Sequence, residues 1–142
     1  MDLLDKKNVR LIDGASDWRE AIRISVMPLE EGGYVEPRYK EAIISGVEKL
    51  GSYIIIAPSI ALPHARPEDG VLKSQIAITL FKNEIKFDKE NAVARLFLTL
   101  AAVDSSGHLN ALMKISEILQ DKEKVNNILK SDNVETLYGY FN

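Results

Sequence analysis

Apolar residues early in the chain recur at intervals of three and four, the spacing that places side chains on one face of a helix. This spacing predicts a helix over residues 17–27, with an inner face formed by Trp18, Ala21, Ile22 and Ser25. Asp17 stands at the N-cap position and Glu20 follows three residues later, which is the pattern of a capping box. Pro28 lacks the backbone N–H that a continuing helix needs, so we expect the helix to stop or change direction there.

A turn and a second helix follow in the pattern. Gly32 and Gly33 mark the turn. Pro37 suits the first turn of a helix, because the N–H that proline lacks has no intrahelical partner at that position. We expect this helix to run to about Leu50 and to end at Gly51, since glycine is common just after a helix.

The middle of the chain has the composition of strands. Residues 53–57 form a short apolar run rich in β-branched side chains, which predicts a strand buried on both faces. Residues 58–70 contain three prolines and predict a constrained connection with a short strand at 60–62. The same criteria assign three further segments: a strand over 75–81, a loop over 87–91 and a central strand over 95–103.

The last third of the chain returns to helical spacing. Polar residues 104–107 end the central strand, and Ser105 or Ser106 is expected to cap a helix over residues 108–120. Two shorter helices are predicted: 122–130 and 134–141. Helices on either side of a group of strands predict an α/β or α+β sandwich, with helices on at least one face of a small sheet. A length of 142 residues suits a single domain, residues 1–142.

Composition narrows the class of protein. A net charge of -3 argues against a strongly basic surface for nucleic acid. The chain has no cysteine, which excludes disulfides, thiolate-bound zinc and a cysteine nucleophile. Its opening residues are too few and too charged for a signal peptide, and no apolar run approaches the roughly 20 residues of a membrane span. We therefore expect a cytoplasmic protein that does not bind nucleic acid.

Two histidines, His64 and His108, are the only ones in the chain. The sequence has no Walker loop, nucleophile elbow or zincin helix. Imidazole is the side chain whose ordinary pKa lies near neutral pH, so proton, metal or phosphoryl chemistry is expected to involve these two residues first.

His64 follows the short predicted strand, in a segment stiffened by Pro63 and Pro67. Proline fixes its own φ and restricts the residue before it, so this loop has few conformations and can hold a reactive side chain. Arg66 lies two residues further on, and its guanidinium matches the planar oxygens of a phosphoryl group. The alternatives are that His64 is an ordinary polar loop residue and that Arg66 pairs with an acidic residue of the same loop.

His108 stands in the predicted first turn of a helix, where unpaired N–H groups and the helix dipole stabilise an anion. The hypothesis is that the fold brings His64 and His108 together at the ends of neighbouring strands. The alternative is a capping or surface histidine. Asp104 either orients a histidine or caps the helix, and the cap is favoured. Lys49 and Lys73 are weaker candidates for a phosphoryl contact, and the favoured interpretation of both is a surface charge. A metal site formed by both histidines and Asp104 is a further alternative.

The segment Ser-Ile-Ala-Leu-Pro-His-Ala-Arg-Pro-Glu at residues 59–68 resembles a known signature. It is similar to the phosphorylation site of enzyme IIA components of the bacterial sugar phosphotransferase system, mannitol/fructose superfamily. The core of that signature, Ile-Ala-x-Pro-His, is met by residues 60–64, and residues 65–68 look most like the ascorbate-type branch. His108 and the apolar positions after it resemble the family segment that carries a second histidine. Many members have glycines before the signature, where this chain has Ala57 and Ser59.

This resemblance implies an α/β fold in which a central mixed β-sheet is flanked by helices on both faces. It also implies a phosphoryl relay in which His64 accepts a phosphoryl group from HPr, with His108 stabilising that group and Arg66 a candidate contact. The group then passes to a cysteine of an enzyme IIB partner, and the membrane enzyme IIC couples the transfer to uptake of ascorbate or a related sugar. No metal or cofactor is implied.

A different class of function uses the same residues. In this alternative the chain is a regulatory module whose phosphorylation at His64 controls its binding to other proteins. Both functions require a docking surface with apolar residues around the site, for which Ile60, Leu62 and Ala65 are candidates. A homodimer is left open.

Overall fold

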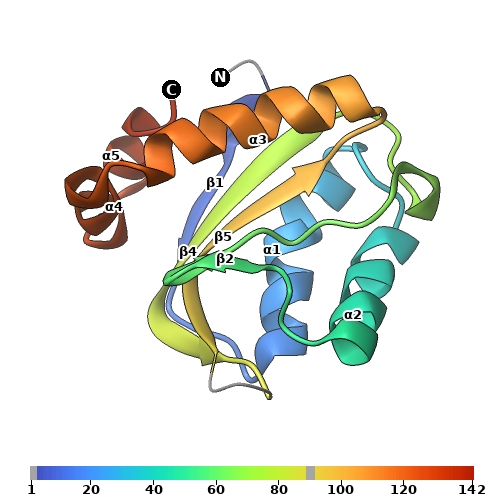
Figure 1. Cartoon of the computed structure of the whole chain (residues 1–142), viewed down its shortest axis with the longest axis horizontal. Helices are drawn as coiled ribbons and strands as arrows, with labels where there is room; N and C mark the ends of the chain where they lie inside the picture. The colour runs from blue at the N-terminus through green and yellow to red at the C-terminus, as the bar shows by residue number, and fades with distance from the viewer. Residues whose placement is uncertain (1–2, 89–91) are drawn as a thin grey trace.

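The computed structural model describes residues 3–88 and 92–142 (Figure 1). Its strands form one five-stranded sheet in the order β1-β4-β5-β3-β2. The strands are β1 (Leu4–Ile12), β2 (Ile55–Ala57), β3 (Ser59–Ala61), β4 (Gln75–Lys86) and β5 (Val93–Ala101). β1 runs parallel to β4 and β3 runs parallel to β5, whereas the β4–β5 and β2–β3 pairs are antiparallel. The sheet is therefore mixed, with β5 at its centre as predicted.

Helices cover both faces of this sheet, so the predicted fold class is confirmed (Figure 1). One face carries α1 (Trp18–Glu31) and α2 (Arg38–Leu50), and the other carries α3 (Ser105–Leu119), α4 (Lys122–Leu129) and α5 (Val134–Gly139). A single 3-10 turn, η1 (Pro67–Asp69), follows β3. No helix among the described residues is long and apolar enough to cross a membrane.

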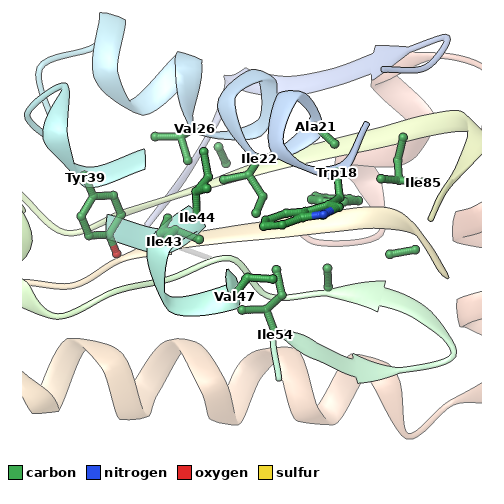
Figure 2. Packing of buried hydrophobic residues seen from close by; sticks show 14 of the residues in the cluster. Trp18, Ala21, Ile22, Val26, Tyr39, Ile43, Ile44, Val47, Ile54 and Ile85 are labelled. Carbon is green, nitrogen blue, oxygen red and sulfur yellow. The ribbon is translucent and has the colours of Figure 1, made fainter. Parts of the chain in front are cut away.

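Alternating side chains of the central strands divide the core into two layers. Phe81 of β4 and Phe97 of β5 point to the α1–α2 side, where their rings meet edge to face with centroids 5.1 Å apart. Their neighbours Leu80 and Leu96 point to the α3 side. Figure 2 shows the first layer, in which apolar residues of α1 and α2 pack together against the sheet. Strands of a sheet that is covered on both faces need apolar side chains on both of their faces, and β4 and β5 have them.

The first elements of the fold differ from the sequence prediction in two connected ways. The chain begins with a strand, β1, that was not predicted, and Pro28 lies inside α1 rather than at its end. A proline at position 28 cannot donate to the carbonyl of Ile24. That carbonyl accepts a hydrogen bond from the Arg10 guanidinium of β1 instead, so the helix continues for another turn. Burial lowers the pKa of Arg10, and nearby Glu31 opposes this effect.

Other boundaries also differ from the sequence prediction. The predicted strand at 53–57 is wrong in being buried on both faces, because β2 lies at the sheet edge and 43% of Ile56 is exposed. β4 extends to Lys86, beyond the predicted end at 81, since its polar last part pairs with Val93 of β5. Of the loop predicted at 87–91, residues 89–91 lie outside the described residues.

The helix predicted at 108–120 begins earlier, at Ser105, and neither Ser105 nor Ser106 caps it. The cap is Asp104, whose Oδ1 accepts a hydrogen bond from the Gly107 N–H at 2.8 Å. This confirms the role favoured for Asp104 and adds three residues to the start of the helix. As a result His108 is the fourth residue of the helix, at the end of its first turn.

Candidate functional site

His64 occupies the loop between β3 and η1, and its ring orientation is fixed by a main-chain contact. The Nδ1 atom lies 2.7 Å from the Leu62 carbonyl oxygen. Because a carbonyl oxygen only accepts, Nδ1 carries the proton and donates it, and the neutral ring presents a lone pair on Nε2. The loop is anchored in turn, since the Leu62 N–H donates to the Ile54 carbonyl at 2.7 Å.

His108 reaches the same place from α3, 44 positions further along the chain. The centroids of the His64 and His108 rings are 5.9 Å apart, with the ring planes tilted by 53°. Both side chains are half-buried. The hypothesis that the fold brings the two histidines together is therefore confirmed in the geometry.

The two rings line an open pocket of about 800 Å³. Its walls come from the C-terminal half of α2, the His64 loop, the end of β5 and the start of α3. The pocket sits where β5 ends and the positive end of the α3 dipole begins, which favours a bound anion. The Gly107 and His108 N–H groups donate to Asp104. The N–H groups of Ser105 and Ser106 have no acceptor among the described residues.

Two cationic side chains, Arg66 and Lys49, also line this pocket. Arg66 does not pair with a neighbouring carboxylate through its guanidinium in the part of the chain that is described. Its backbone N–H donates to Asp69 Oδ2 at 3.0 Å, which closes the η1 turn. The Arg66 side chain is exposed at the edge of the pocket, where it can meet an anion. Lys73 does not line the pocket.

A metal site is not supported. Across residues 3–88 and 92–142, no three His, Asp or Glu side chains are grouped closely enough to hold a metal ion. Asp104 is engaged by the Gly107 N–H, as described above, and the Nδ1 atom of His64 faces a carbonyl rather than a carboxylate.

The apolar surface near the pocket is made of different residues from those predicted. Ile60 and Leu62 were expected to contribute, but they are core residues, 1% and 4% exposed. They face inward because β3 lies beside the central strand β5, and Ala65 is also partly buried. The large exposed apolar side chains come from the end of α2, the turn after it and α3: Leu50, Tyr53, Leu109 and Met113.

Two tyrosines of the site were missed by the sequence reasoning. The Tyr53 ring meets the His64 ring edge to face with centroids 6.0 Å apart, so His64 has both Tyr53 and His108 as ring neighbours. Tyr39 is fully buried below the loop, and its hydroxyl contacts the main chain beside His64. A tyrosine in an apolar stretch of helix signals a buried hydroxyl with a partner, but the partner lies 26 residues away in sequence.

Comparison with known proteins gives the family. Residues 2–142 match the family model described as phosphoenolpyruvate-dependent sugar phosphotransferase system, EIIA 2. The ascorbate-specific PTS system EIIA component of Escherichia coli K12 is 39% identical over 123 residues, which are 85% of this chain and 80% of that protein. This chain therefore belongs to the EIIA 2 family of phosphotransferases and is an enzyme IIA component of the sugar phosphotransferase system.

Solved structures agree with this assignment. The mannitol-specific cryptic phosphotransferase enzyme IIA CmtB from Escherichia coli superposes with a TM-score of 0.92 at 31% identity, covering 99% of this chain and 95% of that one. The complex of enzyme IIAMTL and phosphorylated enzyme IIBMTL from Escherichia coli matches with a TM-score of 0.84 at 26% identity, covering 98% of each chain. The fold predicted from the resemblance and the fold of these relatives are the same.

Proposed function

We propose that His64 is the phosphorylated residue and that the whole chain, residues 1–142, acts as one cytoplasmic relay domain. It accepts a phosphoryl group from phospho-HPr and passes it to an enzyme IIB, which serves the membrane enzyme IIC. The substrate class is ascorbate or a related sugar, by analogy with the ascorbate-specific relatives. The observation that carries the proposal is the Nδ1 contact of His64 with the Leu62 carbonyl, because it leaves Nε2 free in a pocket shared with His108.

The proposed phosphoryl transfer forms one N–P bond as another breaks and uses no metal or cofactor. The Nε2 lone pair of His64 attacks the phosphorus, the new N–P bond forms, and the P–N bond to the donor imidazole breaks with its electron pair returning to that ring. His64 becomes a phosphorylated imidazolium because Nδ1 keeps its proton, and the Leu62 carbonyl stabilises this N–H. Attack on the phosphorus by an enzyme IIB thiolate then returns His64 to its neutral form. Positioning and electrostatic stabilisation are the main contributions expected of the protein in such a reaction.

His108 and Arg66 are proposed to stabilise the phosphoryl group on His64. The His108 ring is close enough to donate to a phosphoryl oxygen, since the two ring centroids are 5.9 Å apart. Arg66 and Lys49 bring two positive charges to the same pocket. The start of α3 adds the favourable end of the helix dipole. These groups together offset the negative charge that arrives with the phosphoryl group.

The docking surface proposed for both partners consists of exposed apolar side chains: Leu50 and Tyr53, which line the pocket, and Leu109 and Met113 of α3, the helix that carries His108. Leu50 ends α2 and Tyr53 follows it in the turn before β2, whereas Leu109 and Met113 belong to α3. HPr and enzyme IIB must use this surface in turn, because both have to reach Nε2 of His64. Buried apolar contacts with a polar rim are typical of such interfaces.

The test is the intact mass of the protein after incubation with phosphoenolpyruvate, enzyme I and HPr. Wild type is expected to gain one acid-labile phosphoryl group, and His64→Ala is expected to gain none. His108→Ala is the matched control, because it removes the other imidazole of the pocket and should still become phosphorylated, with slower onward transfer. Phosphorylation of His64→Ala at the wild-type level would show the assignment to be wrong.

Adding enzyme IIB separates the relay from the regulatory alternative. Loss of the phosphoryl group to an ascorbate-type enzyme IIB, and not to a mannitol-type one, supports the relay and its substrate class. Retention of the group with every enzyme IIB tested supports the regulatory module. Sedimentation of the full chain distinguishes a monomer from the homodimer.

A further inference from the structure

The two main-chain neighbours of His64 are tied to one residue of the central strand. On one side, the Leu100 N–H of β5 donates to the Pro63 carbonyl at 3.0 Å. On the other side, the connection passes through the Tyr39 hydroxyl. This hydroxyl donates to the Leu100 carbonyl at 2.7 Å and accepts from the Ala65 N–H at 3.0 Å. The residues on both sides of His64 are thus connected to Leu100, Pro63 directly and Ala65 through the Tyr39 hydroxyl.

The direction of each hydrogen bond follows from the groups involved. The Leu100 carbonyl can only accept, so the hydroxyl proton of Tyr39 points to it, and an oxygen lone pair is left for the Ala65 N–H. The Ala65 carbonyl is further from the hydroxyl, at 3.4 Å. Tyr39 has no exposed surface, and Figure 2 shows its ring at the edge of the apolar cluster with the oxygen at its tip. Water is therefore not a competing partner for this hydroxyl.

The prolines of the loop leave one place without a constraint. Pro63 fixes its own φ and restricts Leu62, while Pro67 does the same for itself and Arg66. His64 and Ala65 are the two loop residues between these pairs, and neither is restricted by a proline. The Ala65 N–H is part of the peptide between His64 and Ala65. Its hydrogen bond to the Tyr39 hydroxyl therefore holds that peptide in place.

We propose that Tyr39 is a positioning residue of the phosphoryl-transfer site, which fixes the peptide after His64 and so sets the direction of Nε2. The proposal rests on the proposed function of His64. Tyr39 does not touch the phosphoryl group; it acts through the Ala65 N–H and Leu100. Without its hydroxyl the Ala65 N–H loses its partner, the His64–Ala65 peptide becomes free to rotate, and the Nδ1 contact with Leu62 is weakened.

The test compares Tyr39→Phe with a matched control, Ile43→Val. Ile43 is also fully buried, one turn further along α2. Removing one of its methylenes costs stability comparable to one hydrogen bond and leaves the hydrogen bonds of the His64 loop in place. Misplacement of a reacting group by about 1 Å can cost a hundredfold in rate. We expect Tyr39→Phe to lower kcat for phosphorylation by phospho-HPr about tenfold, with KM within about twofold of wild type. Ile43→Val is expected to keep the wild-type kcat.

A second readout does not depend on any partner. The imidazole ¹⁵N signals of His64 report the Nδ1–H tautomer in the unphosphorylated protein. Wild type and Ile43→Val should show one tautomer, and Tyr39→Phe should show signals shifted toward the average of two. If Tyr39→Phe matches Ile43→Val in both kcat and the ¹⁵N signals, Tyr39 is only a core residue and the proposal is overturned.

The role of Tyr39 can still be tested if wild type is not phosphorylated or if Tyr39→Phe does not fold. If wild type is not phosphorylated at all, the proposed function fails, while the ¹⁵N signals still test the role of Tyr39. If Tyr39→Phe does not fold, hydrogen exchange of the wild-type Ala65 amide decides. It should exchange at least about tenfold more slowly than an unprotected amide, and exchange at the unprotected rate would contradict the contact with Tyr39.

Discussion

Ser59 is expected to be a strained position whose replacement by glycine stabilises the protein. It begins β3 with a φ of 67°, and it is the one described residue other than glycine with a positive φ. The left-handed region costs an L-residue about 1–2 kcal/mol. Glycine avoids that cost but gives up roughly 0.5–1 kcal/mol through the greater freedom of the unfolded chain. The difference predicts that Ser59→Gly raises the free energy of unfolding by about 0.5–1 kcal/mol.

Urea unfolding followed by circular dichroism measures this difference. With a slope of about 1.5 kcal/mol per molar urea, the midpoint of Ser59→Gly should rise by about 0.3–0.7 M. Ser59→Ala is the first control, because it removes the hydroxyl and keeps the strain, so its midpoint should stay near that of wild type. Ser52→Gly is the second, since Ser52 has no positive φ and glycine should lower its midpoint. A Ser59→Gly midpoint at or below that of Ser59→Ala would refute the reasoning.

Two further predictions concern docking and pH. Leu109→Glu places a charge in the proposed docking surface beside His108 and should raise KM for phospho-HPr about tenfold with little change in kcat; steady-state kinetics test this, and an equal effect of Met27→Glu, an exposed residue on α1, would contradict it. Burial raises the pKa of Tyr39 to about 12, above its ordinary 10, so the unfolded chain loses this proton first and stability falls as pH rises from 10 toward 12. The fall should reach about 2–3 kcal/mol in urea unfolding of wild type beyond that of Tyr39→Phe. Parallel pH curves for the two proteins would show that Tyr39 is not the cause.

The parts of the site that are encoded locally could be predicted from the sequence. The His64 loop is constrained by its own Pro63 and Pro67. The cap at Asp104 involves only Gly107, three residues further along the chain. The hypothesis that His64 and His108 meet needed one step more, the rule that functional residues gather where strands end. The resemblance to a known signature supplied the chemistry that these residues carry.

The parts that depend on distant partners could not be predicted. β1 alternates poorly because three consecutive charged residues follow Leu4, and only pairing with β4 makes it a strand. Tyr39 looked like any apolar position of an amphipathic helix, since the Ala65 and Leu100 groups that its hydroxyl joins are 26 and 61 residues away. The docking candidates Ile60 and Leu62 were wrong for a related reason, because apolar residues beside a motif do not show which face they take.

The contact between Arg10 and the Ile24 carbonyl makes two distant positions interdependent. Pro28 creates the vacant acceptor and Arg10 fills it, so each residue is tolerated because of the other. The contact also joins the last turns of α1 to β1, so these two elements support each other. Substitution of Arg10 alone leaves the Ile24 carbonyl without its partner. In the divergence of such chains, an amino acid with a free N–H at position 28 would release the constraint on position 10, so the two sites are expected to change as a pair.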